Sequence, residues 1–188
     1  KCYHCNDANC EKVCPERAIH RVDGWVVIDQ NRCIGCGACV NECIYHVPHI
    51  RADNDKTYKC NGCTVHTRDI PACAFACPTG ALTYGPRGRL LDEAQRRLAA
   101  YKRSEFPSAS LYGKDEFDGM RMIVILKDRP DKYGVPVNPP RLNITKVEHA
   151  KDIYALLSVF TFGLAPLKRS AWKLASSMAG IKKRDNIS

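Results

Sequence analysis

Cysteine is absent from the last 111 of the 188 residues, and the sequence lacks both an initiator Met and a signal peptide. Residues 104–140 contain no nucleophile elbow, phosphate-binding loop or nucleotide fingerprint, so catalysis of those kinds is not indicated. The mixed composition excludes a collagen-like, coiled-coil or wholly disordered chain. Because the chain starts directly on a cysteine motif, at Lys1-Cys2, we expect an N-terminal part to be missing.

All twelve cysteines lie in the first 77 residues, far above ordinary usage. They form three tetrads, each of which opens with C-x2-C and closes with C-x3-C, so the segment contains an internal repeat. The tetrads are Cys2, Cys5, Cys10 and Cys14; Cys33, Cys36, Cys39 and Cys43; and Cys60, Cys63, Cys73 and Cys77. Repeated pairs at this spacing are typical of metal ligands rather than of a disulfide framework.

Iron–sulfur clusters explain the spacing better than zinc does. Zinc sites usually combine two C-x2-C halves, whereas here the second half is C-x3-C. The second tetrad is C-x2-C-x2-C-x3-C, the spacing of bacterial ferredoxins that bind [4Fe-4S] clusters. Gly35 and Gly37 allow the close backbone approach that such a loop needs.

In two-cluster ferredoxins the fourth cysteine of each run binds the other cluster, and this rule assigns the ligands. Cluster one is assigned Cys2, Cys5, Cys10 and Cys43, and cluster two is assigned Cys33, Cys36, Cys39 and Cys14. Cluster three is assigned Cys60, Cys63 and Cys73, with its fourth ligand outside the chain. Cys77 then binds a fourth cluster, or it closes cluster three itself. We therefore expect three to four [4Fe-4S] clusters.

The histidines are not needed as ligands, because every tetrad is complete in cysteine. We expect hydrogen-bond donors near the clusters or surface residues at His4, His20, His46, His49 and His66. His4 lies inside the first C-x2-C, from where a hydrogen bond would tune a cluster potential.

Between and after the tetrads, hydrophobic patterns predict regular structure. Residues 18–22 and 25–28 read as a hairpin around Asp23-Gly24, and residues 81–84 as a short strand. Residues 89–102 have the apolar spacing of an amphipathic helix. Residues 122–126 read as a buried strand inside a proline-rich extended arm.

The last 48 residues contain nine basic and three acidic residues around an uncharged, largely apolar run at 153–167. As one helix this run would be about 22 Å long, shorter than the bilayer core of about 30 Å. Lys168 and Arg169 follow the run, and Lys182, Lys183 and Arg184 come near the end. The run fits a short membrane anchor, an interfacial helix or a helix buried on a partner, and a soluble core helix is the remaining alternative.

The sequence resembles the iron–sulfur (beta) subunits of molybdopterin oxidoreductase complexes, above all those of the membrane-bound formate dehydrogenase N type. The resemblance rests on CYHCNDANCEKVCP at residues 2–15, NRCIGCGACVNEC at 31–43, and YKCNGC with IPACAFACPTGAL between 58 and 82. LYGKDEFDGMRMIVIL at 111–126 and KYGVPVNPP at 132–140 resemble the segment that follows the clusters in those subunits. The electron-transfer subunit of membrane-bound nickel–iron hydrogenases is similar in the same places.

The resemblance implies an α+β fold with tandem bacterial-ferredoxin-like [4Fe-4S] domains, followed by an extended arm and an apolar helix. It divides the chain into a two-cluster unit at 1–58, a second ferredoxin-like half with a helix at 59–103, the arm at 104–150, and the apolar helix with its basic tail at 151–188. It also implies a non-catalytic subunit of a hetero-oligomer, associated with the membrane at its periplasmic or, alternatively, its cytoplasmic face. Such a subunit relays electrons from a catalytic molybdopterin-type subunit to a membrane cytochrome b or quinone-reactive subunit.

The net charge of +9 suggests two other classes, a structural zinc module and a nucleic-acid-binding module. The positive charge is concentrated in the last 48 residues and is not interleaved with aromatic residues near the cysteines. Each [4Fe-4S] site with four thiolates carries about −2, which offsets most of the surplus. We therefore expect no nucleic-acid partner, and the apolar tail argues against a free ferredoxin.

Overall fold

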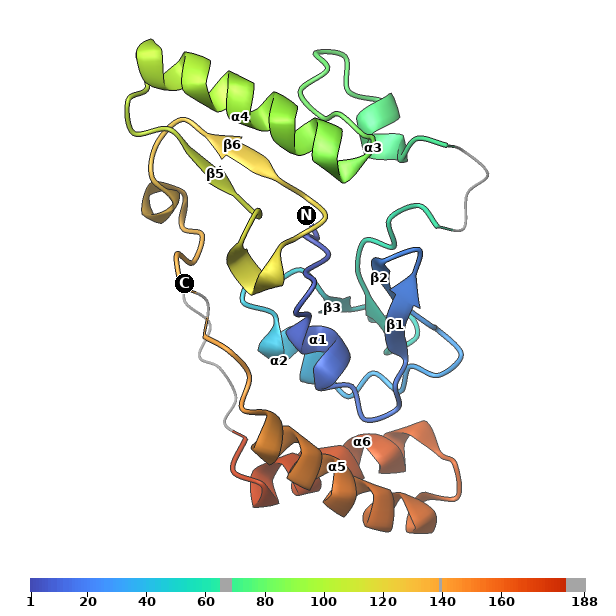
Figure 1. The fold of residues 1–188 in the computed structure, drawn as a ribbon. Coiled ribbons are helices and arrows are strands. Elements are labelled where there is room, and N and C mark those ends of the chain that lie inside the picture. Colours follow the sequence, from blue (N-terminus) through green and yellow to red (C-terminus); the bar gives the residue numbers. More distant parts are fainter. Residues whose placement is uncertain (65–68, 139, 182–188) are drawn as a thin grey trace. The chain divides into compact units, whose positions relative to one another are not determined.

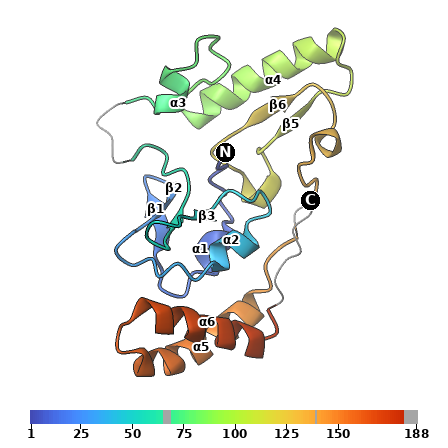
Figure 2. The same cartoon turned by 180° about the vertical axis from the view of Figure 1, so that it is seen from behind.

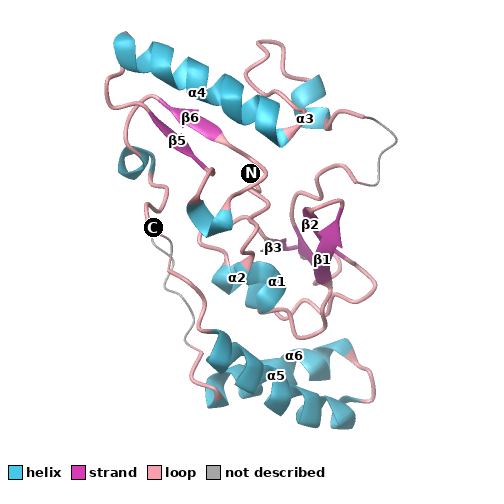
Figure 3. Ribbon diagram, in the orientation of Figure 1, coloured by secondary structure: helices cyan, strands magenta, loops and turns pink. Residues whose placement is uncertain are grey.

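The computed structural model describes residues 1–64, 69–138 and 140–181, and its contacts group the chain into two compact units (Figure 1). Unit 1 contains Lys1–Asp7, Val22–Trp25 and Cys60–Pro139; unit 2 contains Ala8–Arg21, Val26–Lys59 and Pro140–Ser188. Helices and two-stranded sheets both occur, as expected for an α+β chain (Figure 3). The tandem arrangement and the ranges 1–58, 59–103, 104–150 and 151–188 remain predictions.

Short elements surround the first two tetrads. They are α1 (Asn9–Lys12), β1 (Ile19–Val22), β2 (Trp25–Ile28), α2 (Ala38–Glu42), β3 (His49–Ile50) and β4 (Thr57–Tyr58). The predicted hairpin is confirmed as β1–β2, and its turn residues Asp23 and Gly24 have φ of 48° and 77°. Two successive positive φ values are what a two-residue hairpin turn requires. Antiparallel β3 and β4 form a second small sheet, in which Ile50 is opposite Thr57.

The C-terminal part of unit 2 is a helical hairpin, and the expectation of one apolar helix over 153–167 is wrong. Helix α5 (Ile144–Ser158) continues into the short η3 (Val159–Thr161), and α6 (Ala165–Met178) follows. Phe162 and Gly163 have φ of 49° and 77° and end the first helix, and Pro166 lies in the first turn of the second. The two helices lie side by side in both views (Figure 1, Figure 2).

This hairpin, α5–α6, packs on the cysteine-bearing segments of unit 2. Tyr154 and Trp172 meet edge to face with ring centroids 5.8 Å apart. They share one buried cluster with Val13, Ile34, Ala38, Ala150, Ala175 and Ala179. The hairpin therefore completes the hydrophobic core around the second tetrad.

Unit 1 is built from the segment that follows the second tetrad. It contains α3 (Ala72–Phe75), α4 (Arg87–Arg103), β5 (Ser110–Tyr112), η1 (Glu116–Asp118), β6 (Val124–Leu126) and η2 (Pro130–Tyr133). The predicted amphipathic helix is confirmed as α4, and the strand at 122–126 is confirmed over its last three residues. The strand predicted at 81–84 is wrong, because every strand in the described residues belongs to the pairs β1–β2, β3–β4 or β5–β6.

The proline-rich arm lies on the first cysteine motif of its own chain. Cys5 bridges Met120 in antiparallel fashion, and the amide of Asn6 donates to the carbonyl of Gly119 at 2.9 Å. Met120 and Tyr112 are completely buried. The Tyr112 hydroxyl donates to the carbonyl of Pro136 at 2.9 Å. The arm therefore holds the N-terminal residues in place by strand-like pairing.

None of the helices within the described residues is both long enough and apolar enough to cross a bilayer. The basic residues Lys182, Lys183 and Arg184 lie outside the described part of the chain.

The α5–α6 hairpin allows a stability test with a matched control on one helix. Trp172→Ala should lower the free energy of unfolding by about 3–5 kcal/mol, because a large, 3 % exposed side chain leaves a cavity. Leu174→Ala removes a 53 % exposed side chain and should change it by less than about 0.5 kcal/mol. Denaturant unfolding followed by circular dichroism measures both, and equal losses would contradict this description of the core.

Candidate metal centre

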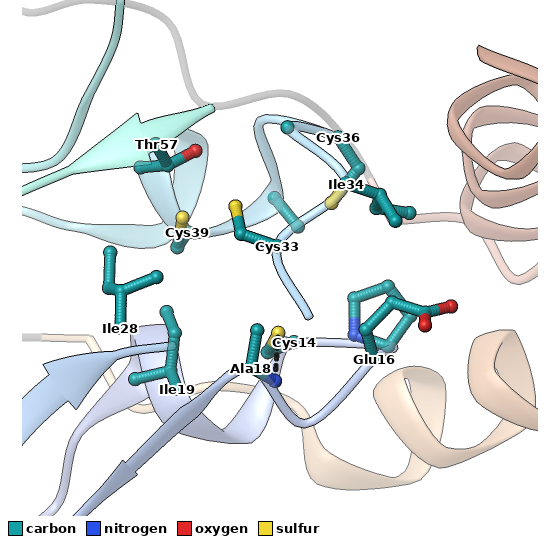
Figure 4. Close-up of a pocket in the computed structure, with 13 residues that line it drawn as sticks. Cys14, Glu16, Ala18, Ile19, Ile28, Cys33, Ile34, Cys36, Cys39 and Thr57 are labelled. Carbon is teal, nitrogen blue, oxygen red and sulfur yellow. Dashed lines mark hydrogen bonds between the residues drawn. The ribbon is translucent and has the colours of Figure 1, made fainter. Parts of the chain in front are cut away.

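Four cysteines from the first two tetrads line one pocket of unit 2 (Figure 4). Cys33, Cys36 and Cys39 come from one loop, residues 33–39, which we call the cluster-two loop. Cys14 stands across the pocket from this loop and precedes strand β1. The rest of the lining is mostly apolar and includes Ile19, Ile28, Ile34, Ala18 and Ala38. These are the four residues that the sequence assigns to cluster two, an assignment that stays a prediction.

Glycine is needed in the cluster-two loop for a steric reason. Gly35 has φ of +67°, and a Cβ there would lie 1.7 Å from the carbonyl oxygen of Asp55. Gly37, with φ of +78°, precedes helix α2, which carries Cys39. Two left-handed residues among seven let the chain turn tightly enough to aim three thiols into one pocket.

Burial makes these thiols poor acids on their own. It raises the pKa of Cys36 and of Cys39 to about 12, and it also raises the pKa of Cys14. Hydrogen bonds oppose the effect, from the Thr57 side chain to Cys39 and from the Ala18 amide, 3.3 Å from the sulfur of Cys14. Without a compensating cation, several neighbouring thiolates would not be stable here.

The donor set, four cysteine thiols around one largely apolar pocket, fits a cubane cluster. Metal coordination deprotonates a thiol outright, and iron replaces the water that burial removes from the sulfurs. Within the described ranges, no three Cys, His, Asp or Glu side chains converge as they would on a single metal ion. A [4Fe-4S] cluster takes one thiolate on each of four irons, so its ligands need not converge on one point.

The residues assigned to cluster one are divided between the units. Cys2 and Cys5 are in unit 1, whereas Cys10 in α1 and Cys43 after α2 are in unit 2. This assignment therefore stays a prediction from the spacing.

The third tetrad lies in unit 1, where a histidine contacts it. Nε2 of His4 lies 3.4 Å from the sulfur of Cys60, and the ring packs edge to face on Trp25 at 4.8 Å between centroids. Gly62 fits closely against the same Trp25, since a Cβ there would lie 2.4 Å from the indole. The sequence position of His4 suggests a role near the first tetrad, whereas the structure places it beside a cysteine of the third.

The other assigned ligands of the third tetrad follow along the chain. Cys63 comes shortly after Cys60, and Cys73 is in helix α3. A hydrogen bond with Thr79, 3.6 Å from sulfur to oxygen, lowers the pKa of Cys77. Both assignments of Cys77, to cluster three and to a fourth cluster, stay predictions.

Of the other four histidines in the cysteine-rich segment, His20, His46 and His49 are exposed, as expected for surface residues. His66 lies outside the described residues.

The sequence did not indicate that the α5–α6 hairpin contributes polar groups around the cluster-two loop. The hydroxyl of Tyr154 donates to Glu16, and Nζ of Lys168 lies 3.0 Å from the same carboxylate. Arg169 donates through Nε to the carbonyl of Ile34, inside the loop, and its Nη1 lies 3.1 Å from Asp55. Burial, followed by the hydrogen bond to Glu16, raises the pKa of Tyr154.

Two features of the sequence could have indicated the helical hairpin itself, although not its polar contacts. Trp172, Ala175 and Ala179 recur at helical spacing, and Gly163 with Pro166 marks the end of one helix and the start of the next.

Comparisons with known proteins agree with the iron–sulfur interpretation. Residues 1–87 match the family model of the 4Fe-4S dicluster domain. The chain is 33 % identical over 145 residues to the iron–sulfur subunit of the nitrate-inducible formate dehydrogenase of Escherichia coli (strain K12), covering 73 % of this chain and 49 % of that protein. It is 32 % identical over 145 residues to the formate dehydrogenase iron–sulfur subunit of Haemophilus influenzae, covering 73 % and 46 %.

A shorter match, 40 % identical over 99 residues, is to the B subunit of the anaerobic dimethyl sulfoxide reductase of Escherichia coli (strain K12), covering 51 % of this chain and 46 % of that protein. The chain spans about half the length of these relatives. It therefore carries a 4Fe-4S dicluster domain at residues 1–87 and is similar, over a longer stretch, to the iron–sulfur subunits of formate dehydrogenases.

Proposed function

We propose that this chain is the electron-transfer subunit of a molybdopterin oxidoreductase of the formate dehydrogenase type. In this role it relays electrons through [4Fe-4S] clusters from a catalytic subunit to a cytochrome b or quinone-reactive subunit in the membrane. The observation that carries the proposal is the pocket lined by Cys14, Cys33, Cys36 and Cys39 at ferredoxin spacing. The relatives named above support the kind of complex.

The residues around the pocket have the properties that electron transfer requires. A [4Fe-4S] cluster supplies a one-electron couple whose potential depends on charge, hydrogen bonds and exposure. Ile19, Ile28 and Ile34 exclude water from the pocket. Thr57 and the amide of Ala18 hydrogen-bond the sulfurs of Cys39 and Cys14. A cluster in this pocket would be shielded from water and hydrogen-bonded by the chain, and we propose no catalytic residue in this subunit.

Association with a membrane is part of the same proposal, on its periplasmic or alternatively its cytoplasmic face. The turn of the α5–α6 hairpin exposes a run of large apolar side chains, the most exposed being Phe162 at 87 %. The run also includes Leu156, Val159, Phe160 and Leu164. Apolar side chains gathered at one turn suit a lipid surface or an apolar subunit better than water.

Isolation of the tagged full chain from its native host tests the proposed function. We expect it in the membrane fraction, with a subunit that contains molybdenum or tungsten and with a haem-containing cytochrome b. Reduced samples should give the EPR signals of [4Fe-4S] clusters. Nickel in place of molybdenum or tungsten would instead support the hydrogenase alternative, and zinc without cubane signals would contradict both.

The cluster-two loop provides a steric test with a matched glycine. Gly35→Ala should prevent assembly of one cluster and lower the iron content by about four atoms per chain, because its Cβ would overlap the carbonyl of Asp55. Gly88→Ala is the control, since Gly88 lies in helix α4 and nothing lies within 4 Å of an added Cβ. Iron and sulfide analysis distinguishes the two, and full occupancy in Gly35→Ala would refute this description of the loop.

His4 provides a test of the third tetrad. His4→Phe keeps a ring against Trp25 but removes the group 3.4 Å from the sulfur of Cys60. A donor to a thiolate favours the reduced, more negative cluster, so its loss should lower one midpoint potential by tens of millivolts, on the order of 1 kcal/mol.

EPR-monitored redox titration measures this shift. His20→Phe is the control, because His20 is an exposed residue of β1. Unchanged potentials in His4→Phe would rule out the hydrogen bond as a tuning element.

A further inference from the structure

We infer that the α5–α6 hairpin is an electrostatic cap on cluster two, in which Arg169 is a positioning residue that raises the reduction potential of that cluster. The inference rests on the proposed function and goes beyond it, because it assigns a redox role to a segment that follows all the cysteines. It depends on contacts within unit 2 alone.

The hairpin holds both chain segments that supply the four cysteines of the pocket. On the Cys14 side, Val13 is in the shared core, and Glu16 binds Tyr154 and Lys168. On the loop side, Ile34 and Ala38 are in the same core, and Cys36 packs against it. A single helical hairpin thus fixes the distance between Cys14 and the cluster-two loop, and it shields Cys36 from water.

Arg169 brings a permanent positive charge to the loop. Its guanidinium remains protonated at any physiological pH, so its effect does not depend on titration. Nε donates to the carbonyl of Ile34, the residue that follows Cys33. This donor polarises the peptide bond between Ile34 and Gly35, which strengthens the Gly35 amide as a donor within the loop.

Asp55 opposes this effect only in part. The Arg169 side chain is 25 % exposed, whereas the Asp55 side chain is 63 % exposed, so water screens the carboxylate more strongly. Lys168 lies 3.0 Å from Glu16, a carboxylate that lines the pocket, and offsets its charge. The guanidinium is therefore the less screened member of the pair with Asp55, and it is also the one that donates directly into the loop.

The sign of the effect follows from the redox couple. Reduction adds one electron to the cluster, which changes its core from about 2+ to about 1+ with no proton required. The site becomes more negative, so a nearby cation stabilises the reduced form and raises the potential. Loss of the cation should lower it.

The experiment uses the full chain in its isolated complex, with EPR-monitored titration by dithionite. Cys36→Ala first identifies the signal of cluster two as the one that it removes or converts. Arg169→Gln should then lower the ratio of reduced to oxidised cluster two about threefold to tenfold at a fixed potential, a shift of roughly 30–60 mV for one electron. Arg169→Lys keeps the charge and should stay closer to the wild type.

Two further variants separate charge from folding. Lys173→Gln removes an exposed charge from the same helix and should leave the potential unchanged. Asp55→Asn should raise the potential, because it removes the opposing carboxylate. A purely structural role for Arg169 would give the same result for Arg169→Lys and Arg169→Gln, and this would overturn the inference.

The outcomes also separate this inference from the proposed function. Cubane signals in the wild type together with an unchanged cluster-two potential in Arg169→Gln would overturn the cap alone. A wild-type protein without cubane signals would overturn the proposed function and the cap together.

Discussion

The cost of burying thiolates is the constraint on which the rest of this structure depends. Cys36 and Cys39 face an apolar pocket in which burial raises the pKa of each thiol to about 12. A pocket of this kind is unfavourable for free thiolates and favourable for thiolates that share iron, because the metal supplies the missing positive charge. The short elements around the pocket are too small to form a core of their own, so we expect cluster binding and folding to be strongly coupled.

Tight packing of the backbone around the pocket follows from the same constraint. A loop that directs three thiols inward within seven residues needs left-handed turns, which Gly35 and Gly37 provide. The carbonyl of Asp55, after β3, lies where a Cβ on Gly35 would be. The loop is therefore held against its neighbours by close contact as well as by hydrogen bonds. The proposed electron transfer would benefit from such packing, because a fixed environment keeps the reorganisation that accompanies a change of charge small.

The sequence predicted the features that depend on local spacing. The hairpin β1–β2 and the helix α4 follow from short motifs whose geometry is nearly self-contained. Cys14 shares a pocket with three cysteines of the second tetrad, although the binding of a cluster there stays a prediction. Prediction from the sequence failed where the outcome depends on partners far along the chain. Residues 81–84 have strand composition but no partner strand among the described residues, and the contact of His4 with Cys60 joins positions 56 apart. The apolar run at 153–167 has the composition of one helix, whereas Gly163 and Pro166 decide its structure.

Two of the basic residues that give the C-terminal segment its excess positive charge have specific partners in the structure. Lys168 and Arg169 directly follow the apolar run, where the sequence suggested a role at a membrane surface. Both bind groups next to the cluster-two pocket instead, through Glu16, Asp55 and the carbonyl of Ile34. The exposed apolar side chains of the turn and the inward cations of α6 therefore belong to two different faces of one hairpin. A substitution at Phe162 should affect association with a lipid or a subunit, whereas one at Arg169 should affect the cluster, because the two residues share a helical hairpin but not a contact surface.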